Sequence, residues 1–438
     1  MSLLSKFKND PLFTKIIRSS GSLFSNNTLA LGLSVVQGIM ATRLLGPAGF
    51  GLIGVVMAFA STVNSIFSFR MSELVVRYGG EYLNKRENEK ASALMKAAGL
   101  TEGFVSLLAF LVVLFTASLA ETYLAKTTDA AWMFTVFALN LLANFNTETS
   151  TGVLQVTDRI KMQGTINLIQ AVVTTLIIAG AFFLGGNITV VLIAYLIGKS
   201  IIGLGLFIAA QIQLKDRLGA GWWRTPFTAL TERNEIFRFA FSSNISATII
   251  KLFRESELIW VGLFLDTTAV GYYRVAYTIT HFLAIPADPL IATTFPEINR
   301  LAVEKAWNKL KSFLKKVTAF SFAYNIVLGA GLILFGRWVI RIYSGADYLN
   351  AYPALVALTI GLVFNYILFW NRPLLLALGL PEVPVYVTLT VGIIKLALSF
   401  WLVPVYGVTA AGGLLSFYYI ASVGVMVLRG LKEIGNRK

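Results

Sequence analysis

The sequence predicts an all-α polytopic membrane protein, and three observations support this fold class. Hydrophobic residues make up 56% and charged residues 13% of the 438 residues, whereas soluble domains average roughly 45–50% and 25%. The mean hydropathy is +0.72. Apolar stretches close to the roughly 20 residues that cross a bilayer as a helix recur from end to end and are separated by short polar loops.

The apolar stretches predict about twelve transmembrane helices. They cover residues 22–43, 50–69, 97–118, 131–153, 165–186, 188–212, 237–262, 269–295, 313–335, 353–377, 384–404 and 407–428. The tightest connections are "GGN" at 185–187 and "PVYG" at 404–407. The expected parts are an amphipathic cytoplasmic surface segment (1–21), an N-lobe of six helices (22–212), a cytoplasmic interfacial linker (213–236), a C-lobe of six helices (237–428) and a basic cytoplasmic tail (429–438).

Lysine and arginine residues predict the orientation. Counted together with the flanks of the spans, segments on the N-terminal side of the membrane hold 27 of these residues, and segments on the other side hold 4. Because cytoplasmic loops carry the excess of basic residues, we expect both termini in the cytoplasm. The net charge of +15 lies beside the spans, so it indicates topology and contact with anionic membrane lipids rather than nucleic-acid binding.

Composition also excludes several kinds of site. The chain has no cysteine and one histidine, His281. Disulfide frameworks, thiol nucleophiles and thiolate or multi-histidine metal sites are therefore excluded. The outer loops are short and gather no cluster of acids. We therefore expect no catalytic residue, no metal site and no cofactor.

The two halves of the chain are related by a shift of 220 residues. The shift places "RLLGPAGFGLIGVVMAF" (43–59) on "LFLDTTAVGYYRVAYTI" (263–279) and pairs Gly51 with Gly271. The basic loops that follow also align, with Lys85 on Lys305. Both repeats begin on the cytoplasmic side, so the sequence predicts parallel halves related by an axis along the membrane normal.

The same two hairpins carry a family resemblance. "ATRLLGPAGFGLIGVVMAFASTVNSIFSFRMSELVVRYGGEYL" resembles the first hairpin of Wzx-like polysaccharide flippases, and "FLDTTAVGYYRVAYTI" resembles their matching second-half hairpin. These flippases belong to the multidrug/oligosaccharidyl-lipid/polysaccharide exporter superfamily. The resemblance implies two six-helix lobes in a V around a central cavity. It also implies alternating-access transfer of a polyprenyl-pyrophosphate-linked oligosaccharide to the outer leaflet of a prokaryotic inner membrane. Expected partners are that substrate, membrane lipids and other polysaccharide assembly proteins, and H+ or Na+ is the expected coupling ion.

Segment 237–262 carries charges where a membrane helix is expected. Asn244, Thr248, Lys251 and Glu255 are spaced to share one helix face. Arg254 lies at the edge of that face, and Glu257 can reach it at i,i+3. Such a stripe is typical of a helix that lines a water-filled cavity. Structural ion pairs between Lys251 and Glu255 and between Arg254 and Glu257 are the alternative.

Segment 269–295 repeats this design. Arg274, Thr278, His281, Ile285 and Asp288 are spaced to share one face, and Pro286 predicts a kink. His281 is a candidate proton relay or a hydrogen-bonded interior histidine. Asp288 is a candidate for cargo or ion binding, or a cap of the helix after Pro286.

Further cations lie within the expected spans. They are Lys199, Arg372 and Lys395. The C-lobe thus holds a surplus of intramembrane cations, which suits an anionic cargo such as a lipid pyrophosphate. Arg372 is close enough to the predicted cytoplasmic end of its span that it could instead snorkel to the interface.

The N-lobe is polar with little charge. Asn140, Asn144, Thr147 and Thr151 are predicted to form one stripe on span 131–153, with Glu148 beside it. Amides suit sugar hydroxyls, but they also join membrane helices to one another. Glu148 is the N-lobe candidate for a coupling-ion site.

Three rival functions predict sequence features that differ from those of a flippase. A multidrug exporter of the same superfamily would carry intramembrane acids without surplus cations. A membrane-embedded glycan polymerase or glycosyltransferase would carry a large soluble loop or an acid cluster outside the bilayer. A structural scaffold would not explain the charged stripes.

The predicted orientation can be tested with single cysteines, since the chain has none. We expect cysteines at Lys85, Trp222 and Lys311 to react with an impermeant maleimide only after cells are permeabilised. Cysteines at Lys126 and Asp347 should react in intact cells. Labelling at position 85 in intact cells would contradict the orientation.

Overall fold

A computed structural model describes residues 11–68, 70–232, 234–236, 238 and 256–437. These residues are almost entirely helical and include no β-strand. They belong to two units that interleave along the chain. The first unit comprises residues 1–44, 59–121 and 128–248, and the second comprises 45–58, 122–127 and 249–438. Residues 45–58 therefore pack with the second unit, although the sequence assigned them to the N-lobe.

Seven of the described helices are long and apolar enough to cross a membrane. They are Asn26–Phe67, Asn88–Ala125, Ile160–Leu184, Ile188–Leu218, Trp307–Ser344, Ala346–Ala377 and Glu382–Asn436. The first and the last bend at Gly46 (φ 64°) and Gly407 (φ 62°), which have the left-handed backbone that glycine adopts without strain. Each bend coincides with a connection expected between two spans. The total of twelve spans remains a prediction.

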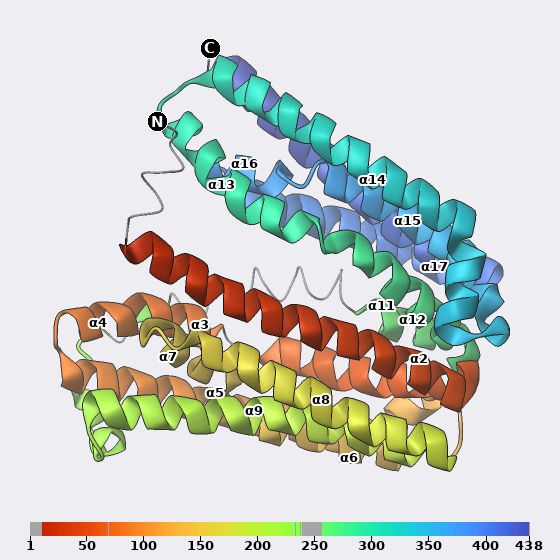
Figure 1. The fold of residues 1–438 in the computed structure, drawn as a ribbon, viewed down its shortest axis with the longest axis horizontal. Helices are drawn as coiled ribbons and strands as arrows, with labels where there is room; N and C mark the ends of the chain where they lie inside the picture. Colours follow the sequence, from red (N-terminus) through yellow and green to blue (C-terminus); the bar gives the residue numbers. More distant parts are fainter. Residues whose placement is uncertain (1–10, 69, 233, 237, 239–255, 438) are drawn as a thin grey trace. The chain divides into compact units, whose positions relative to one another are not determined.

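The first unit is built from helices that lie side by side (Figure 1). They are α2 (Pro11–Phe67, shared with the second unit), α3 (Met71–Leu74), α4 (Gly80–Asn84), α5 (Asn88–Ala120), α6 (Ala131–Ala143), α7 (Thr147–Val156), α8 (Ile160–Leu184) and α9 (Ile188–Leu218). The "GGN" connection is confirmed, because Gly185 ends α8 with φ 68° and Asn187 caps α9. The helix over the predicted span 131–153 is interrupted, because the chain turns at residues 144–146 between α6 and α7.

Among the described residues, the second unit contains seven further helices, which are labelled in Figure 1. They are α11 (Glu257–Phe264), α12 (Thr267–His281), α13 (Ala287–Val303), α14 (Trp307–Ser344), α15 (Tyr352–Ile367) and α16 (Asn371–Ala377), and α17 (Glu382–Asn436) completes the unit. The predicted interruption at Pro286 is present, since a short 3-10 turn at Phe282–Ala284 separates α12 from α13. Span 353–377 is also divided, at residues 368–370 between α15 and α16.

The linker 213–236 packs on the first unit. Leu230 and Ile236 are buried in the apolar cluster that α3, α4 and α5 form. Tyr82 donates a hydrogen bond to Glu232 (2.6 Å) and Tyr78 donates one to Glu235 (2.9 Å). The hydrogen bond from Tyr82 lowers the pKa of Glu232, and burial with the same bond raises the pKa of Tyr82. The linker is therefore an ordered part of the first unit over these residues.

A reciprocal close contact joins the two repeat hairpins inside the second unit. A Cβ on Gly51 would lie 1.8 Å from the carbonyl oxygen of Thr267, and a Cβ on Gly271 would lie 2.1 Å from that of Pro47. The 220-residue shift exchanges these two contacts, because it maps Pro47 onto Thr267 and Gly51 onto Gly271. Only glycine allows the backbones of α2 and α12 to approach this closely.

We expect Gly51→Ala to lower the thermal unfolding midpoint of the purified protein, because overpacking a tight contact costs about 1–3 kcal/mol. Gly331→Ala is the matched control: Gly331 lies in α14 with open space around its Cβ position. The control should leave stability unchanged or raise it, since alanine favours a helix over glycine by about 0.5–1 kcal/mol. Equal midpoints for the two variants would show that the contact carries no constraint.

Candidate functional site

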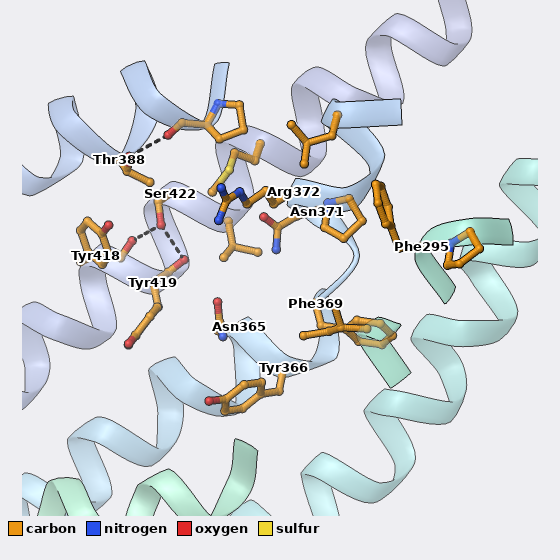
Figure 2. A pocket seen from close by; sticks show the side chains of 17 residues that line it. Phe295, Asn365, Tyr366, Phe369, Asn371, Arg372, Thr388, Tyr418, Tyr419 and Ser422 are labelled. Atoms are coloured by element: carbon orange, nitrogen blue, oxygen red, sulfur yellow. Dashed lines mark hydrogen bonds between the residues drawn. The ribbon is translucent and has the colours of Figure 1, made fainter. Parts of the chain in front are cut away.

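The second unit contains a pocket of about 520 Å³. Its walls come from α13, α15, α16 and the parts of α17 before and after the bend at Gly407 (Figure 2). The lining combines aromatic rings, two amides and one guanidinium. The residues with this chemistry are Phe295, Tyr366, Phe369, Tyr418, Tyr419, Asn365, Asn371 and Arg372. Pockets of roughly 300–1,000 Å³ with this mixture of apolar and polar groups are typical of ligand sites.

The interruption between α15 and α16 positions one wall of the pocket. Asn371 donates from its amide nitrogen to the carbonyl oxygen of Leu368 (2.8 Å), which fixes the turn. Pro373 lies in the first turn of α16, where its missing N–H needs no partner. The turn brings Asn365 and Arg372 from different helices to the same space, as Figure 2 shows. Arg372 is exposed and lines the pocket.

The opposite wall is held by hydroxyl groups bonded to their own helix. Ser422 donates to the carbonyl oxygen of Tyr418 (2.6 Å), and Thr388 donates to that of Pro384 (2.7 Å), as Figure 2 shows. These bonds satisfy the hydroxyl protons within α17. The oxygen lone pairs can still accept hydrogen bonds from a ligand.

A buried ion pair lies next to the pocket. Glu257 of α11 contacts Lys395 of α17, and their side chains are only 6% and 3% exposed. The hydroxyl group of Tyr273 donates to Glu257 (3.3 Å). The Lys395 ammonium lies 5.8 Å from the ring centre of Tyr418, which also lines the pocket. The sequence offered Arg254 as an alternative partner of Glu257. Arg254 lies outside the described residues, and the structure places Lys395 against Glu257.

Arg274 lies in a different part of the second unit. Its guanidinium donates to the carbonyl oxygen of Phe50 (2.8 Å) and lies 4.0 Å from the centre of the Phe50 ring. The Arg274 side chain also crosses Gly54, where a Cβ would lie 2.9 Å from its Cδ. These contacts place the Arg274 side chain against α2, and Arg274 is not among the residues that line the 520 Å³ pocket.

The first unit holds a second polar centre, at the interruption between α6 and α7. Buried Glu102 of α5 accepts hydrogen bonds from the backbone N–H groups of Glu148 (2.8 Å) and Thr149 (2.9 Å). The Glu148 carboxylate accepts a hydrogen bond from the hydroxyl group of Ser72 (2.5 Å). The carboxylates of Glu102 and Glu148 thus both lie at the N-terminus of α7. The backbone N–H groups and the helix dipole favour negative charge there. Glu102 was missed because nothing in its sequence neighbourhood indicates a partner 46 residues away.

The remaining sequence candidates belong to both units. Asn144 donates to the carbonyl oxygens of Asn140 (2.8 Å) and Lys199 (3.1 Å), so these three residues are brought together. Lys199 is exposed. His281 is exposed, and its ring centre lies 4.8 Å from that of Tyr277. Asn244, Thr248, Lys251, Arg254, Glu255 and the side chain of Asp288 lie outside the described residues.

A metal centre has no candidate among the residues that the structure describes. No group of three or more histidine, aspartate or glutamate side chains there could hold a metal ion. The groups available to a ligand are the Arg372 guanidinium, side-chain amides and aromatic faces.

Sequence comparison finds two matches. The model of a family described as "Polysaccharide biosynthesis protein" matches residues 16–302, more than half of the chain. The chain is also 23% identical over 350 residues to the inner membrane protein YghQ of Escherichia coli strain K12. That match covers 78% of this chain and 96% of YghQ.

Structure comparison finds the same fold in membrane transporters. An inward-facing multidrug resistance MATE family transporter of the MOP superfamily has a TM-score of 0.75 at 15% identity, covering 92% of this chain and 94% of its own. The lipid II flippase MurJ in an inward closed conformation has a TM-score of 0.71 at 15% identity, covering 96% and 90%. The predicted all-α membrane fold is confirmed.

The buried ion pair makes a prediction about stability. Glu257→Gln or Lys395→Met alone should each destabilise the protein strongly, because removing one partner of a buried pair costs about 3–5 kcal/mol. The double variant should regain part of this loss, since it leaves no unpaired charge. Unfolding in detergent by denaturant would measure the cycle.

An exposed pair supplies the control for that cycle. Glu297 pairs with exposed Arg300, and Glu297→Gln should cost less than about 1 kcal/mol. A single Lys395→Met variant as stable as this control would contradict a structural role for the buried pair.

Proposed function

The chain belongs to the polysaccharide biosynthesis protein family, and from this premise we propose that it flips a polyprenyl-pyrophosphate-linked oligosaccharide from the cytoplasmic to the outer leaflet. Its fold is shared by a MATE family transporter of the MOP superfamily and by the lipid II flippase MurJ. The proposal extends the family and the fold to a cargo with a charged phosphate group, a glycan and a lipid chain.

The chemistry of the 520 Å³ pocket carries the proposal. Arg372 offers a planar guanidinium that can bind a phosphate through two parallel hydrogen bonds. The amides of Asn365 and Asn371 can exchange hydrogen bonds with sugar hydroxyls. The rings of Phe369 and Tyr418 offer faces on which the apolar side of a sugar ring can stack. The volume suits a phosphate with its first sugars rather than a long glycan.

The charge balance of the second unit makes Arg372 the central cation of this pocket. Lys395 is neutralised by Glu257 and shielded from solvent. Arg372 remains exposed at the pocket, so its charge can offset the solvation that a phosphate loses on leaving the headgroup region. Lys251 and Arg254 remain sequence candidates for the same cargo.

Transport by alternating access would need elements that bend and a source of energy. The interruptions at residues 282–286 and 368–370 lie in the second unit, and the latter directly adjoins the pocket. In the first unit, Glu148 with Ser72 and Glu102 is the proposed site of H+ or Na+ coupling, since two nearby carboxylates favour binding of a cation or a proton.

Arg372→Ala should reduce flipping of a short-chain polyprenyl-pyrophosphate glycan in proteoliposomes about 10- to 100-fold. A hydrogen bond to a charged group contributes about 1.5–3 kcal/mol. Arg372→Lys should retain partial activity if a point charge suffices and little if the two-bond geometry matters. The measurement is the rate at which the fluorescent lipid becomes accessible to a quencher outside the vesicle.

Arg341→Ala is the control, because Arg341 is an exposed arginine of α14 outside the pocket. It should flip the lipid at the wild-type rate. Wild-type flipping by Arg372→Ala would refute the role of the pocket. Export of a hydrophobic cation with no movement of the lipid-linked glycan would favour the multidrug exporter.

A further inference from the structure

The second unit contains a second cavity, of about 660 Å³. It is a groove between α14, the turn at 368–370 and the last turns of α17, and it shares no lining residue with the 520 Å³ pocket. Leu314, Ala319, Phe322, Leu368, Val427 and Leu431 make it strongly apolar. The groove therefore suits a hydrocarbon chain.

Two lysines stand at one end of this groove. Lys311 and Lys315 are four residues apart on α14, so they lie on the same helix face, and both line the groove. Neither forms an ion pair with any acidic residue in the described part of the chain, whereas nearby Arg300, Arg429 and Arg437 each contact a glutamate. The end of the groove is therefore positively charged without internal compensation.

The floor of the groove is fixed. Trp370 is 3% exposed, and its indole N–H donates to the hydroxyl group of Thr318 (2.8 Å). This bond ties the turn at 368–370 to α14 and satisfies the indole N–H of Trp370. A ligand chain can enter without breaking hydrogen bonds, which keeps the cost of binding low.

The groove has the position and length of one lipid tail. Along α14, Lys311 to Phe322 spans about 16 Å at 1.5 Å per residue, close to half of a hydrocarbon core of roughly 30 Å. The basic residues predict that this end of α14 faces the cytoplasm. The lysines thus lie at headgroup level, and the apolar part of the groove runs into the leaflet.

We propose that this groove binds one acidic phospholipid of the cytoplasmic leaflet, with its tail along α14 and its phosphate between Lys311 and Lys315. This lipid is a resident ligand and is separate from any transported cargo. Phe369 lines the 520 Å³ pocket and Trp370 lines the groove. The lipid therefore holds the same turn that shapes the pocket, so its occupancy stabilises that wall.

The test uses the full-length protein in detergent. Native mass spectrometry would measure binding of phosphatidylglycerol, phosphatidylcholine and inorganic phosphate. The variant K311Q/K315Q should bind phosphatidylglycerol roughly 30-fold more weakly, since each lysine at an anionic headgroup contributes about fivefold. The wild type should prefer phosphatidylglycerol to phosphatidylcholine, and inorganic phosphate alone should bind too weakly to compete.

A matched control separates the groove from general surface charge. Lys309 and Lys316 lie on the same helix, are exposed and do not line the groove. K309Q/K316Q should therefore bind phosphatidylglycerol as the wild type does. Ala319→Trp, which fills the apolar part of the groove, should abolish binding while leaving the unfolding midpoint within a few degrees of the wild type.

Three results would overturn the proposal. If K309Q/K316Q lost as much phosphatidylglycerol binding as K311Q/K315Q, the loss would reflect non-specific electrostatic attraction. Equal binding of phosphatidylcholine would remove the role of the lysines. Undiminished binding by folded Ala319→Trp would place the lipid elsewhere. None of these outcomes depends on the flippase assay, so the two proposals fail independently.

Discussion

Backbone N–H and C=O groups in a hydrocarbon environment have no water to bond with, so they must find partners inside the protein. This constraint makes the chain helical almost throughout. It also makes each interruption of a helix dependent on side chains that replace the missing backbone bonds. At residues 144–146 the carboxylate of Glu102 takes two backbone N–H groups. At 368–370 the amide of Asn371 takes a carbonyl oxygen. The polar centres of both units therefore occur at interrupted helices.

The charges of the second unit are divided between two roles. Lys395 and Glu257 lie in the interior, where an unpaired ion would be very costly and where each neutralises the other. Arg274 lies against a backbone oxygen and an aromatic face of α2. Arg372 is exposed at a pocket. A count of intramembrane cations does not distinguish these residues, but their surroundings do. Among the described C-lobe candidates, Arg372 is the one that lines the pocket and offers a guanidinium to a ligand there.

The internal repeat explains the symmetric contact of Gly51 and Gly271, whereas the adjacent pair, Gly54 and Arg274, is not symmetric. Gly51 and Gly271 each pack against the hairpin of the other repeat. One helical turn further on, the same shift pairs Gly54 with Arg274, and here the arginine crosses the glycine. The two hairpins thus have the same backbone arrangement. At the second pair, Arg274 of one hairpin packs over Gly54 of the other, which has no side chain to block it.

The sequence alone determined the class of this protein, because hydropathy, basic loops and glycine or proline positions act locally. The bends at Gly46 and Gly407, the turn at 185–187 and the interruption at Pro286 follow from residues within a few positions of each one. Only the tertiary structure decided which polar groups meet. Glu102 and Glu148 are 46 residues apart, Glu257 and Lys395 are 138 apart, and the pocket draws on four separate helices. Such pairings depend on how helices pack, and helical periodicity specifies the face of a residue but not the neighbour that the face meets.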